Sequence, residues 1–503
     1  MATIFMDPVT RIEGHLSVRT EIDEGQVKAA FCSGEMFRGF EVLLKGRDPL
    51  DAQQITQRIC GVCPVSHGTA SVFAQEQAYG TTPAKNGRLM RNLILGANFI
   101  QSHILHFYHL CALDFVDIAA VTSYSGDDRV LGALKAWVAS QSASHVTFPA
   151  APFLPRFEGN YLKDADANLL AIRHYVDALD MRKLAHQMAA IFAGKMPHVP
   201  SLVPGGLTES VNADKIAIYA SILGKLKIFI EQAYVPDLLA VAGAFPEYSK
   251  IGRSGGNFLA FGGFPQSDDN ADRFFPAGVL VQGKLTTPDI SQITEDVGYS
   301  KFSSASGLKP AVGETVADPK KSGAYSWLKA PRYQGQPMEV GPLAHVMVSC
   351  QSGKNQAING QVNAVLAAAK LKMEDLDSVL GRHVARAIEA KVLIDQCGRW
   401  LDELNPDEPS SIEYTIPESG QGAGLMEAPR GALGHWLEIK DKKISRYQCV
   451  VPTTWNCSPR DDHGTPGPVE QALVGVAVAD AQNPIEVARV IRSFDPCLAC
   501  AVH

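Results

Sequence analysis

Hydrophobic and polar residues alternate in two short stretches of this chain, and each stretch predicts a β-hairpin. The first runs from His15 to Phe31 and turns at Glu24-Gly25. The second has strands at Trp436–Ile439 and Ile444–Val451 around the turn Asp441-Lys442-Lys443. We therefore expect small peripheral β-sheets.

Apolar residues recur with helical spacing over much of the remaining chain. From Gly87 to about Ala120 they cover nearly every face, which predicts a long helix buried in the protein. Its three histidines, His103, His106 and His109, are expected to be hydrogen-bonded structural residues, because no carboxylate partners them at metal spacing. Further helices are expected at approximately residues 49–59, 67–78, 165–193, 213–242, 356–370, 373–404 and 485–494, the last capped by Asn483-Pro484.

Residues 257–345 have a different character, because Gly, Pro and Ser separate short apolar runs there. This pattern predicts mixed strands and loops in a peripheral layer. From its length of 503 residues alone, the chain would be expected to form about three domains. We expect instead one continuous unit over residues 1–503, with an α+β, predominantly helical fold: a core of long buried helices and small peripheral sheets.

The amino-acid composition argues against several classes of function. A net charge of -7 argues against a nucleic-acid-binding or acidic-membrane-binding surface. No run of about 18 uncharged apolar residues occurs, so no transmembrane span is expected. The first residues, Met1–Asp7, lack the basic region and long apolar stretch of a signal peptide.

The ten cysteines fall into two groups. Four form C-x-x-C pairs near opposite ends, Cys60/Cys63 and Cys497/Cys500, and could close onto one metal if the two ends meet. Four thiolates suit zinc, iron, an iron–sulfur cluster or nickel, and the spacing does not choose among them. The other six are expected to be buried structural thiols, in a protein that folds in a reducing compartment: Cys32, Cys111, Cys350, Cys397, Cys449 and Cys457.

Both cysteine pairs belong to longer motifs. The first is Arg58-Ile59-Cys60-Gly61-Val62-Cys63 with His67, and the second is Asp495-Pro496-Cys497-Leu498-Ala499-Cys500-Ala501-Val502-His503. Between and before them stand Arg11-Ile12-Glu13-Gly14-His15, Arg38-Gly39-Phe40-Glu41, His106-Phe107-Tyr108-His109-Leu110, Ala428-Pro429-Arg430-Gly431 and Thr453-Thr454-Trp455-Asn456. These motifs cover essentially the whole chain. In their residues and their order they resemble the large subunit of nickel–iron hydrogenases. The resemblance implies reversible heterolytic cleavage of molecular hydrogen to protons and electrons.

The resemblance also implies a metal centre. Cys60, Cys63, Cys497 and Cys500 would bind nickel, and Cys63 and Cys500 would bridge to an iron that carries carbon monoxide and cyanide. A second metal, magnesium or iron, is implied at Glu41, the Cys449 carbonyl and His503.

Further residues are implied to surround the centre. Cys497 and Glu13 would carry the proton, although a salt bridge from Glu13 to Arg11 is the alternative. Arg430 would act as an electrostatic clamp oriented by Asp495. The remaining implied positions are His67 as a donor to a bridging sulfur, and Pro429 and Thr453 facing the diatomic ligands.

One departure from the family pattern concerns Ser102. Most relatives carry aspartate there, so no catalytic role is carried over to this serine. The serine brings the chain close to the selenium-containing branch, whose selenocysteine would fall at Cys497, here a cysteine.

Two other functions remain as alternatives. A quinone-binding subunit of respiratory complexes shares this fold but lacks the cysteine pairs, and a zinc- or cluster-stapled scaffold would use them without catalysis. Under the hydrogenase reading all four paired cysteines are committed to nickel, so iron–sulfur clusters are expected only in a smaller partner subunit. That heterodimer would pass electrons to a carrier such as a cytochrome. It would lie in the periplasm, exported with the small subunit, with the cytoplasm as the alternative.

Overall fold

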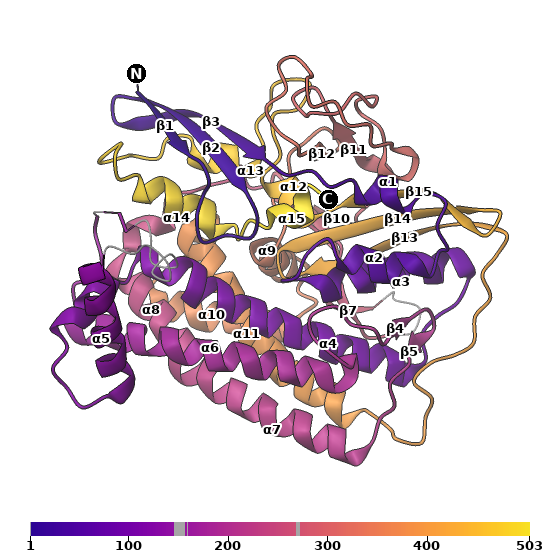
Figure 1. Cartoon of the computed structure of the whole chain (residues 1–503), viewed down its shortest axis with the longest axis horizontal. Helices are drawn as coiled ribbons and strands as arrows, with labels where there is room; N and C mark the ends of the chain where they lie inside the picture. Colours follow the sequence, from indigo (N-terminus) through magenta and orange to yellow (C-terminus); the bar gives the residue numbers. More distant parts are fainter. Residues whose placement is uncertain (1, 145–155, 158, 268–271) are drawn as a thin grey trace.

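Long helices form one half of the molecule and small sheets the other (Figure 1). The computed structural model describes residues 2–144, 156–157, 159–267 and 272–503. The fold is α+β and predominantly helical, as the sequence predicts. The main helices of the bundle are α4 (Lys85–Ile104), α6 (Ala165–Ala193), α7 (Ala213–Phe229) and α11 (Val379–Asp402).

Helix α4 packs between α6 and α11, and every residue from Asn86 to Ile104 is buried. This confirms the buried helix, but not its expected length. The chain continues from Ile104 as a π-helical turn, Leu105–Cys111, and a short 3₁₀ turn, Ala112–Asp114. A π turn holds an extra residue and rotates the side chains that follow. Hydrophobic spacing does not reveal such a turn where all faces are apolar.

A second π-helical turn divides the helix expected at 213–242. Ile230–Tyr234 separates α7 from α8 (Val235–Ala244). Pro236 lies in the first turn of α8 and has no N–H to donate back along the helix. The wider turn accommodates this missing donor.

Three other helix starts differ from expectation. Helix α11 begins at Val379 rather than at Met373, because Met373–Leu376 form a separate 3₁₀ turn and the Ser378 side chain caps α11. Helix α3 (Pro64–Tyr79) begins directly after Cys63, because Pro64 suits the first turn of a helix. Asn483 does not cap α14 (Ile485–Ser493), since its side-chain amide donates to Asp480. The other helices used below are α1 (Phe40–Leu44), α2 (Asp51–Gln57), α9 (Pro342–Ser352), α10 (Gln356–Ala369), α13 (Pro468–Leu473) and α15 (Leu498–Ala501).

Both predicted hairpins are confirmed, and each gains a third strand. Strands β2 (Leu16–Asp23) and β3 (Gln26–Gly34) pair with β1 (Ala2–Met6). Strands β14 (Gly431–Lys440) and β15 (Lys443–Val450) pair with β13 (Ser419–Ala428), on which α3 packs. The glycines of β13 conceal it in the sequence, since glycine is depleted in strands.

Residues 257–345 contain short strands in small sheets, apart from 268–271, which lie outside the described residues. The strands are β6 (Phe258–Ala260), β7 (Gly263–Pro265), β8 (Arg273–Phe275), β9 (Gly278–Val281), β10 (Lys284–Thr286), β11 (Ile293–Asp296) and β12 (Ala330–Tyr333). The last residues of this range already belong to α9, a helix that the sequence analysis did not anticipate.

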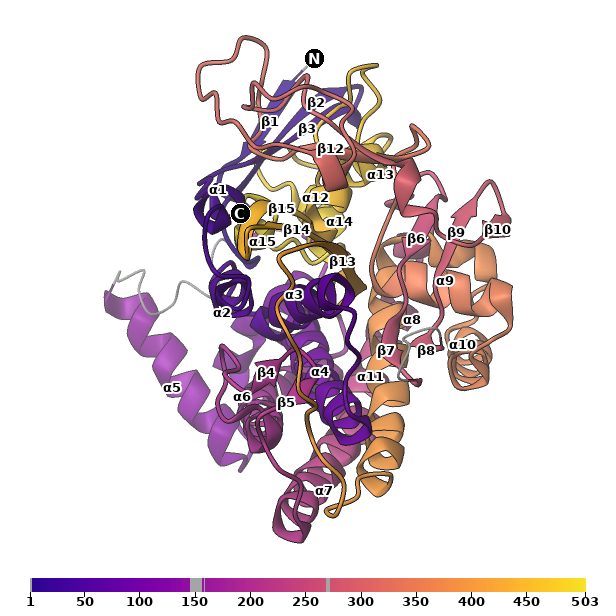
Figure 2. The ribbon, with the colours of Figure 1, turned by 90° about the vertical axis from the view of Figure 1, so that its right-hand side faces the viewer.

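The first and last segments of the chain meet inside the molecule (Figures 1 and 2). Glu13 forms a parallel β-bridge with Cys497. The amides of Gly39 and Phe40 donate to the carbonyl oxygen of His503, at 2.9 and 3.1 Å. Both cysteine pairs are therefore brought to one place. Among the described helices, none is both long and apolar enough to cross a bilayer.

Candidate metal centre

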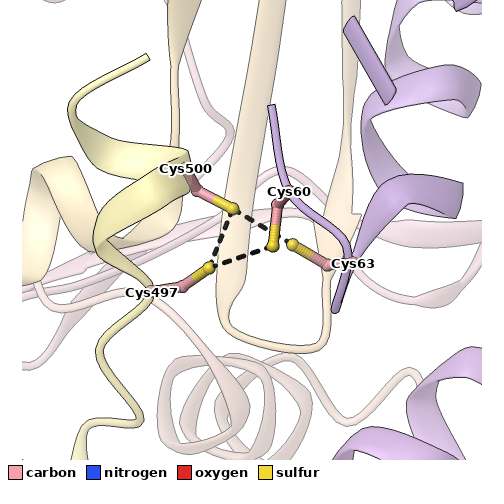
Figure 3. Close-up of side chains that lie close together, drawn as sticks. All are labelled: Cys60, Cys63, Cys497 and Cys500. Carbon is pink, nitrogen blue, oxygen red and sulfur yellow. Dashed lines mark hydrogen bonds between the residues drawn. The ribbon is translucent and has the colours of Figure 1, made fainter. Parts of the chain in front are cut away.

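Four thiols converge at the junction between the two ends of the chain (Figure 3). Cys60 lies in the loop after α2, and Cys63 is the N-cap residue of α3. Cys497 is the N-cap residue of α15, and Cys500 lies within that helix. The sulfur atoms of Cys60 and Cys497 are 3.5 Å apart, those of Cys63 and Cys500 3.1 Å, and those of Cys497 and Cys500 2.9 Å.

The surroundings of these thiols favour a bound cation. All four are buried, and their sulfur atoms lie within 4.8 Å of one another. Hydrogen bonds from the other thiols lower the pKa of Cys60, whereas burial raises the pKa of Cys497 and Cys500. Four thiolates so close together would repel strongly without a positive charge between them. The donor set is soft sulfur, which fits nickel, iron or zinc.

A small cavity adjoins Cys63, Cys497 and Cys500. Cys63 and Cys500, one from each cysteine pair, could hold a further metal ion beside this cavity. Thr453 lines it and accepts a hydrogen bond from the Cys497 amide at 3.0 Å. Pro429 does not line it, although its neighbours do. The other lining residues are Ser66, His67, Ala428, Arg430, Leu433 and Pro452.

His67 belongs to a buried series of hydrogen-bonded side chains. The sequence analysis identified His67 but not its hydrogen-bond partners. Its Nε2 lies 3.4 Å from the Cys500 sulfur, and its Nδ1 lies 3.2 Å from Nε2 of His435. His435 Nδ1 in turn lies 2.8 Å from the Tyr447 hydroxyl. Burial lowers the pKa of His67 to about 4, so the ring is neutral. If the Tyr447 hydroxyl donates to His435 and His435 to His67, the Nε2–H of His67 faces Cys500.

Glu13 lies beside the thiol of Cys497. That thiol donates to Glu13 Oε2 at 3.2 Å, and the Ala499 amide donates to the same oxygen at 2.9 Å. Burial, followed by the charge of Cys60, raises the pKa of Glu13. Gly14 makes this approach possible, since a Cβ there would lie 2.8 Å from the backbone nitrogen of Ala499. Arg11 pairs with Asp114, so the alternative ion pair between Glu13 and Arg11 is not observed.

Arg430 approaches the thiols from the end of β13. Its guanidinium donates to the Asp495 carboxylate at 3.0 Å and to the Asp495 carbonyl at 3.1 Å. It also donates to the Ser102 hydroxyl at 3.4 Å, a contact the sequence analysis did not anticipate. Burial works against its charge, but Asp495 and the thiols outweigh burial and raise the pKa of Arg430.

Glu41, Cys449 and His503 form a second buried cluster, 4.8 Å or less across their ligand atoms. His503 Nε2 lies 3.2 Å from Glu41, and the Cys449 amide donates to Glu41 at 2.8 Å. Lys329 stands 3.8 Å from Glu41. Burial alone would raise the pKa of Glu41, but Lys329 and His503 lower it below its usual range. Glu295 and Thr315 line the same cavity, so its oxygen atoms also suit a hard dication.

The three helix histidines are hydrogen-bonded, as predicted. His106 and His109 lie 2.7 and 3.2 Å from the carbonyls of Arg492 and Tyr175. His103 has a carboxylate partner, Glu389, at 2.9 Å, contrary to the sequence expectation. Glu389 is 286 positions away in the chain, which is why sequence spacing could not reveal it.

All six single cysteines are free thiols, and five are buried; Cys350 is partly exposed. Burial raises the pKa of Cys32, Cys111 and Cys397. These thiols are therefore protonated, as expected for structural cysteines. Cys449 differs from them because it also belongs to the second cluster.

The fold and the site together define a class: a metalloprotein with a buried, thiolate-bound transition-metal centre and acid–base groups beside it. Comparison with known proteins identifies the family. A family model described as nickel-dependent hydrogenase matches residues 38–503, and a second, described as HoxL-like, matches residues 3–33. The chain belongs to the nickel-dependent hydrogenase large subunits.

Individual relatives agree with this assignment over the full length. The periplasmic NiFeSe hydrogenase large subunit of Desulfomicrobium baculatum is 43% identical over 516 residues, covering 99% of this chain and 94% of that protein. The hydrogenase-2 large chain of Escherichia coli (strain K12) is 35% identical over 549 residues, covering 99% and 97%. The structure of the reduced, active Ni-Fe-Se hydrogenase from Desulfomicrobium baculatum matches with a TM-score of 0.89 at 43% identity, covering 100% of both chains.

Proposed function

We propose that this large subunit cleaves molecular hydrogen heterolytically and reversibly at a nickel–iron centre. Cys60, Cys63, Cys497 and Cys500 would hold the nickel, and Cys63 and Cys500 would also hold an iron with carbon monoxide and cyanide ligands. The cavity on the Cys63–Cys500 side supports this arrangement, because it provides room for small ligands there. When bound, the metal pair supplies the acceptor for the electrons of hydrogen.

The observation that carries the proposal is the contact between Cys497 and Glu13. A base must take the proton when hydrogen is split, and a buried site needs a second group to take that proton away. The Cys497 sulfur is the first base, and Glu13 Oε2, at 3.2 Å, receives the proton from it. The Ala499 amide holds that oxygen toward the sulfur.

Arg430 would contribute through its fixed charge and its position. Its guanidinium, oriented by Asp495, stabilises negative charge that develops at the thiolates and excludes water from the cavity. Thr453, which lines the cavity and accepts a hydrogen bond from the Cys497 amide, is proposed to face the diatomic ligands, whereas Pro429 does not line that cavity. His67 would donate to the bridging sulfur of Cys500.

The second cluster is proposed to bind magnesium, or ferrous iron, through Glu41, the backbone carbonyl of Cys449 and His503. Carboxylate oxygens favour magnesium, whereas the imidazole favours iron. The buried carboxylate beside His503 links the last residue of the chain to the loop before α1. A cation there would stabilise the junction that carries both cysteine pairs.

Electrons are proposed to leave through an iron–sulfur small subunit and then a carrier such as a cytochrome, in the periplasm. Among the described residues, the paired cysteines are the one set of four clustered thiols. Four exposed apolar residues lie in or near α1 in the sequence, and we propose that they form one patch: Met36, Val42, Leu43 and Leu50. Arg38, in the same loop, donates to the carbonyls of Ile59 and Ala499 beside the two cysteine pairs. This patch suits a partner that receives electrons from the centre.

The test is a Glu13→Gln variant of the purified heterodimer. Glutamine keeps the volume and can accept from the Ala499 amide, but it cannot carry a proton between the thiol and the next group. We expect wild-type nickel content and an unchanged infrared spectrum, with turnover and hydrogen–deuterium exchange both lowered by about 10²-fold or more.

The matched control is Glu21→Gln on β2, where the carboxylate pairs with Arg19 away from the thiols. The control should keep full activity. Near wild-type turnover in Glu13→Gln with intact metals would show that the proton leaves by another route.

A further inference from the structure

Asp114 is a buried carboxylate that joins the two segments carrying Glu13 and Cys497. Its Oδ1 accepts from Arg11 at 2.5 Å and from Arg492 at 2.6 Å, and both guanidinium groups are nearly inaccessible to solvent. Burial alone would raise the pKa of Asp114, but Arg11 and Arg492 lower it, so the group is ionised. One carboxylate therefore balances two buried cations from distant parts of the chain.

Each arginine stands close in sequence to one member of the proposed proton pair. Arg11 precedes Glu13 in the loop before β2, and Arg492 lies at the end of α14, just before Cys497. Arg492 also donates to the carbonyl of Thr10 at 2.9 Å and to its hydroxyl at 3.1 Å. The loop and the helix are thus fastened to each other as well as to Asp114.

Asp114 joins two segments, the loop before β2 and the stretch from the end of α14 to Cys497. Each segment contains a residue with a strained backbone conformation. Arg11 has φ 56° and Asp495 has φ 57°, and neither is glycine. Residues with a side chain adopt this left-handed region only at a cost in free energy, and they persist where surrounding contacts hold them. The two arginine–carboxylate bonds are such contacts, since each lies within a few residues of one strained position.

The direct pairing of the two segments is short. The Leu498 amide donates to the Glu13 carbonyl at 2.8 Å, and the Glu13 amide donates to the Pro496 carbonyl at a longer 3.3 Å. These two backbone bonds and the bond from the Ala499 amide to Glu13 Oε2 are the direct links, so the separation of Glu13 Oε2 and Cys497 Sγ also depends on how the two segments are held by their other contacts.

We propose that Asp114 is a positioning residue that holds Glu13 within hydrogen-bond distance of Cys497. The inference rests on the proposed function only in giving Glu13 the role of proton acceptor. Asp114 itself touches neither the thiols nor the site of hydrogen cleavage. It acts through Arg11 and Arg492, which fix the loop and the end of α14 relative to each other.

Backbone amide exchange of the heterodimer tests the positioning directly. In Asp114→Asn, peptides covering residues 10–16 and 494–502 should exchange at least about tenfold faster, since a 1.4 kcal/mol loss of local stability corresponds to a factor of ten. A peptide from the middle of α11 should keep its protection. Asp117→Asn is the matched control: Asp117 follows Asp114 by three residues and pairs with Arg156 instead of with Arg11 or Arg492. It should leave both segments protected.

Activity supplies the second readout. Turnover per bound nickel in Asp114→Asn should fall about tenfold, because small misplacements of reacting groups can cost up to about 10²-fold, and the solvent isotope effect should rise. A purely structural role would lower the yield of metal-loaded enzyme without changing either quantity per nickel.

Arg11→Gln covers the case in which Asp114→Asn does not fold, since it keeps the pair of Asp114 with Arg492. The same two segments should then exchange faster by a smaller factor. Unchanged protection of both segments in the folded variants overturns the proposal. If Glu13→Gln proves fully active, the proposed proton transfer from Cys497 to Glu13 is wrong. The amide exchange still decides whether Asp114 holds the two segments together.

Discussion

At the scale of single residues, the tautomer of His67 depends on groups far from the thiols. A neutral imidazole has one N–H, so His67 can donate to Cys500 only if its other nitrogen accepts. His435 is in place to provide that donor, and it does so when the Tyr447 hydroxyl donates to the other nitrogen of His435. The Tyr447 hydroxyl thus influences the sulfur of Cys500 through the imidazole rings of His435 and His67.

Tyr447→Phe should weaken this chain. Without the hydroxyl, His435 is free to turn its N–H away from His67, and the hydrogen bond to Cys500 becomes weaker. We expect shifted infrared bands of the iron ligands and a 10- to 100-fold loss of activity or metal affinity, roughly the usual effect of such outer partners. Tyr219→Phe, which removes a hydroxyl bound to the Leu93 carbonyl inside the helix bundle, is the control. Identical bands in Tyr447→Phe and wild type would contradict this role.

Site residues that stand in local sequence motifs could be predicted from the sequence. The residues that contact them in the folded chain could not. The two cysteine pairs, Glu13 and Arg430 stand in recognisable local patterns. His435 is 368 positions from His67 and belongs to a β-strand, so only the folded chain reveals the contact. Ser102 likewise has no local signal for its contact with Arg430.

At the scale of elements, α3 lies directly on the glycines of β13. A Cβ at Gly424 would meet the carbonyl oxygen of Ala70, and one at Gly422 would meet that of Ala74. Because Cys63 is the N-cap residue of α3 and α3 carries His67, this close approach sets the depth of both residues.

Gly424→Ala should therefore push α3 off the sheet. We expect a loss of about 3 kcal/mol or more, at the upper end of overpacking effects because the clash is with backbone. A lower nickel content and a lower midpoint temperature of thermal unfolding of the heterodimer would show this loss of stability. Gly360→Ala in α10, where the added Cβ meets nothing, should be neutral or slightly stabilising. Equal behaviour of the two variants would count against the packing argument.

Helix α13 carries a buried acid, Glu470, beneath β3. It accepts from the Cys32 amide and the Tyr325 hydroxyl, both at 2.9 Å, and burial raises its pKa to about 7. The folded protein therefore holds this proton more tightly than the unfolded chain does. The stabilisation is complete below the unfolded pKa of about 4.3 and is lost as pH rises through 7.

Glu470→Gln should remove this pH dependence. The amide oxygen can accept both hydrogen bonds, and the uncharged side chain avoids the cost of burying a carboxylate. Relative to wild type, the variant should gain roughly 3 kcal/mol between pH 5 and pH 8, measured from unfolding midpoints across that range. Parallel curves for the two proteins would show that Glu470 does not titrate there.

Element types followed from the sequence better than element ends. The helices over 165–193 and 356–370 are close to α6 and α10. The π-helical turns after α4 and α7 were not predictable, because one inserted residue barely changes an apolar pattern. Strand β13 was hidden by the glycines that its contact with α3 requires.

At the scale of the whole molecule, the two ends of the chain close a single structure. One cluster of buried apolar residues runs from Ile4 to Val502 and includes residues of the bundle and of the sheets. This continuity supports the proposal that residues 1–503 form one unit, with 257–345 as a layer within it. The sequence indicated this closure only through its two cysteine pairs, which could bind one metal only if the two ends of the chain meet.

The central claim is that these four thiols hold nickel together with an iron that carries carbon monoxide and cyanide. An infrared spectrum of the purified heterodimer, with metal analysis of the same sample, tests it most directly. The account predicts bands of metal-bound carbon monoxide and cyanide, with about one nickel per chain. A protein that holds zinc, contains no nickel and shows no such bands would contradict it.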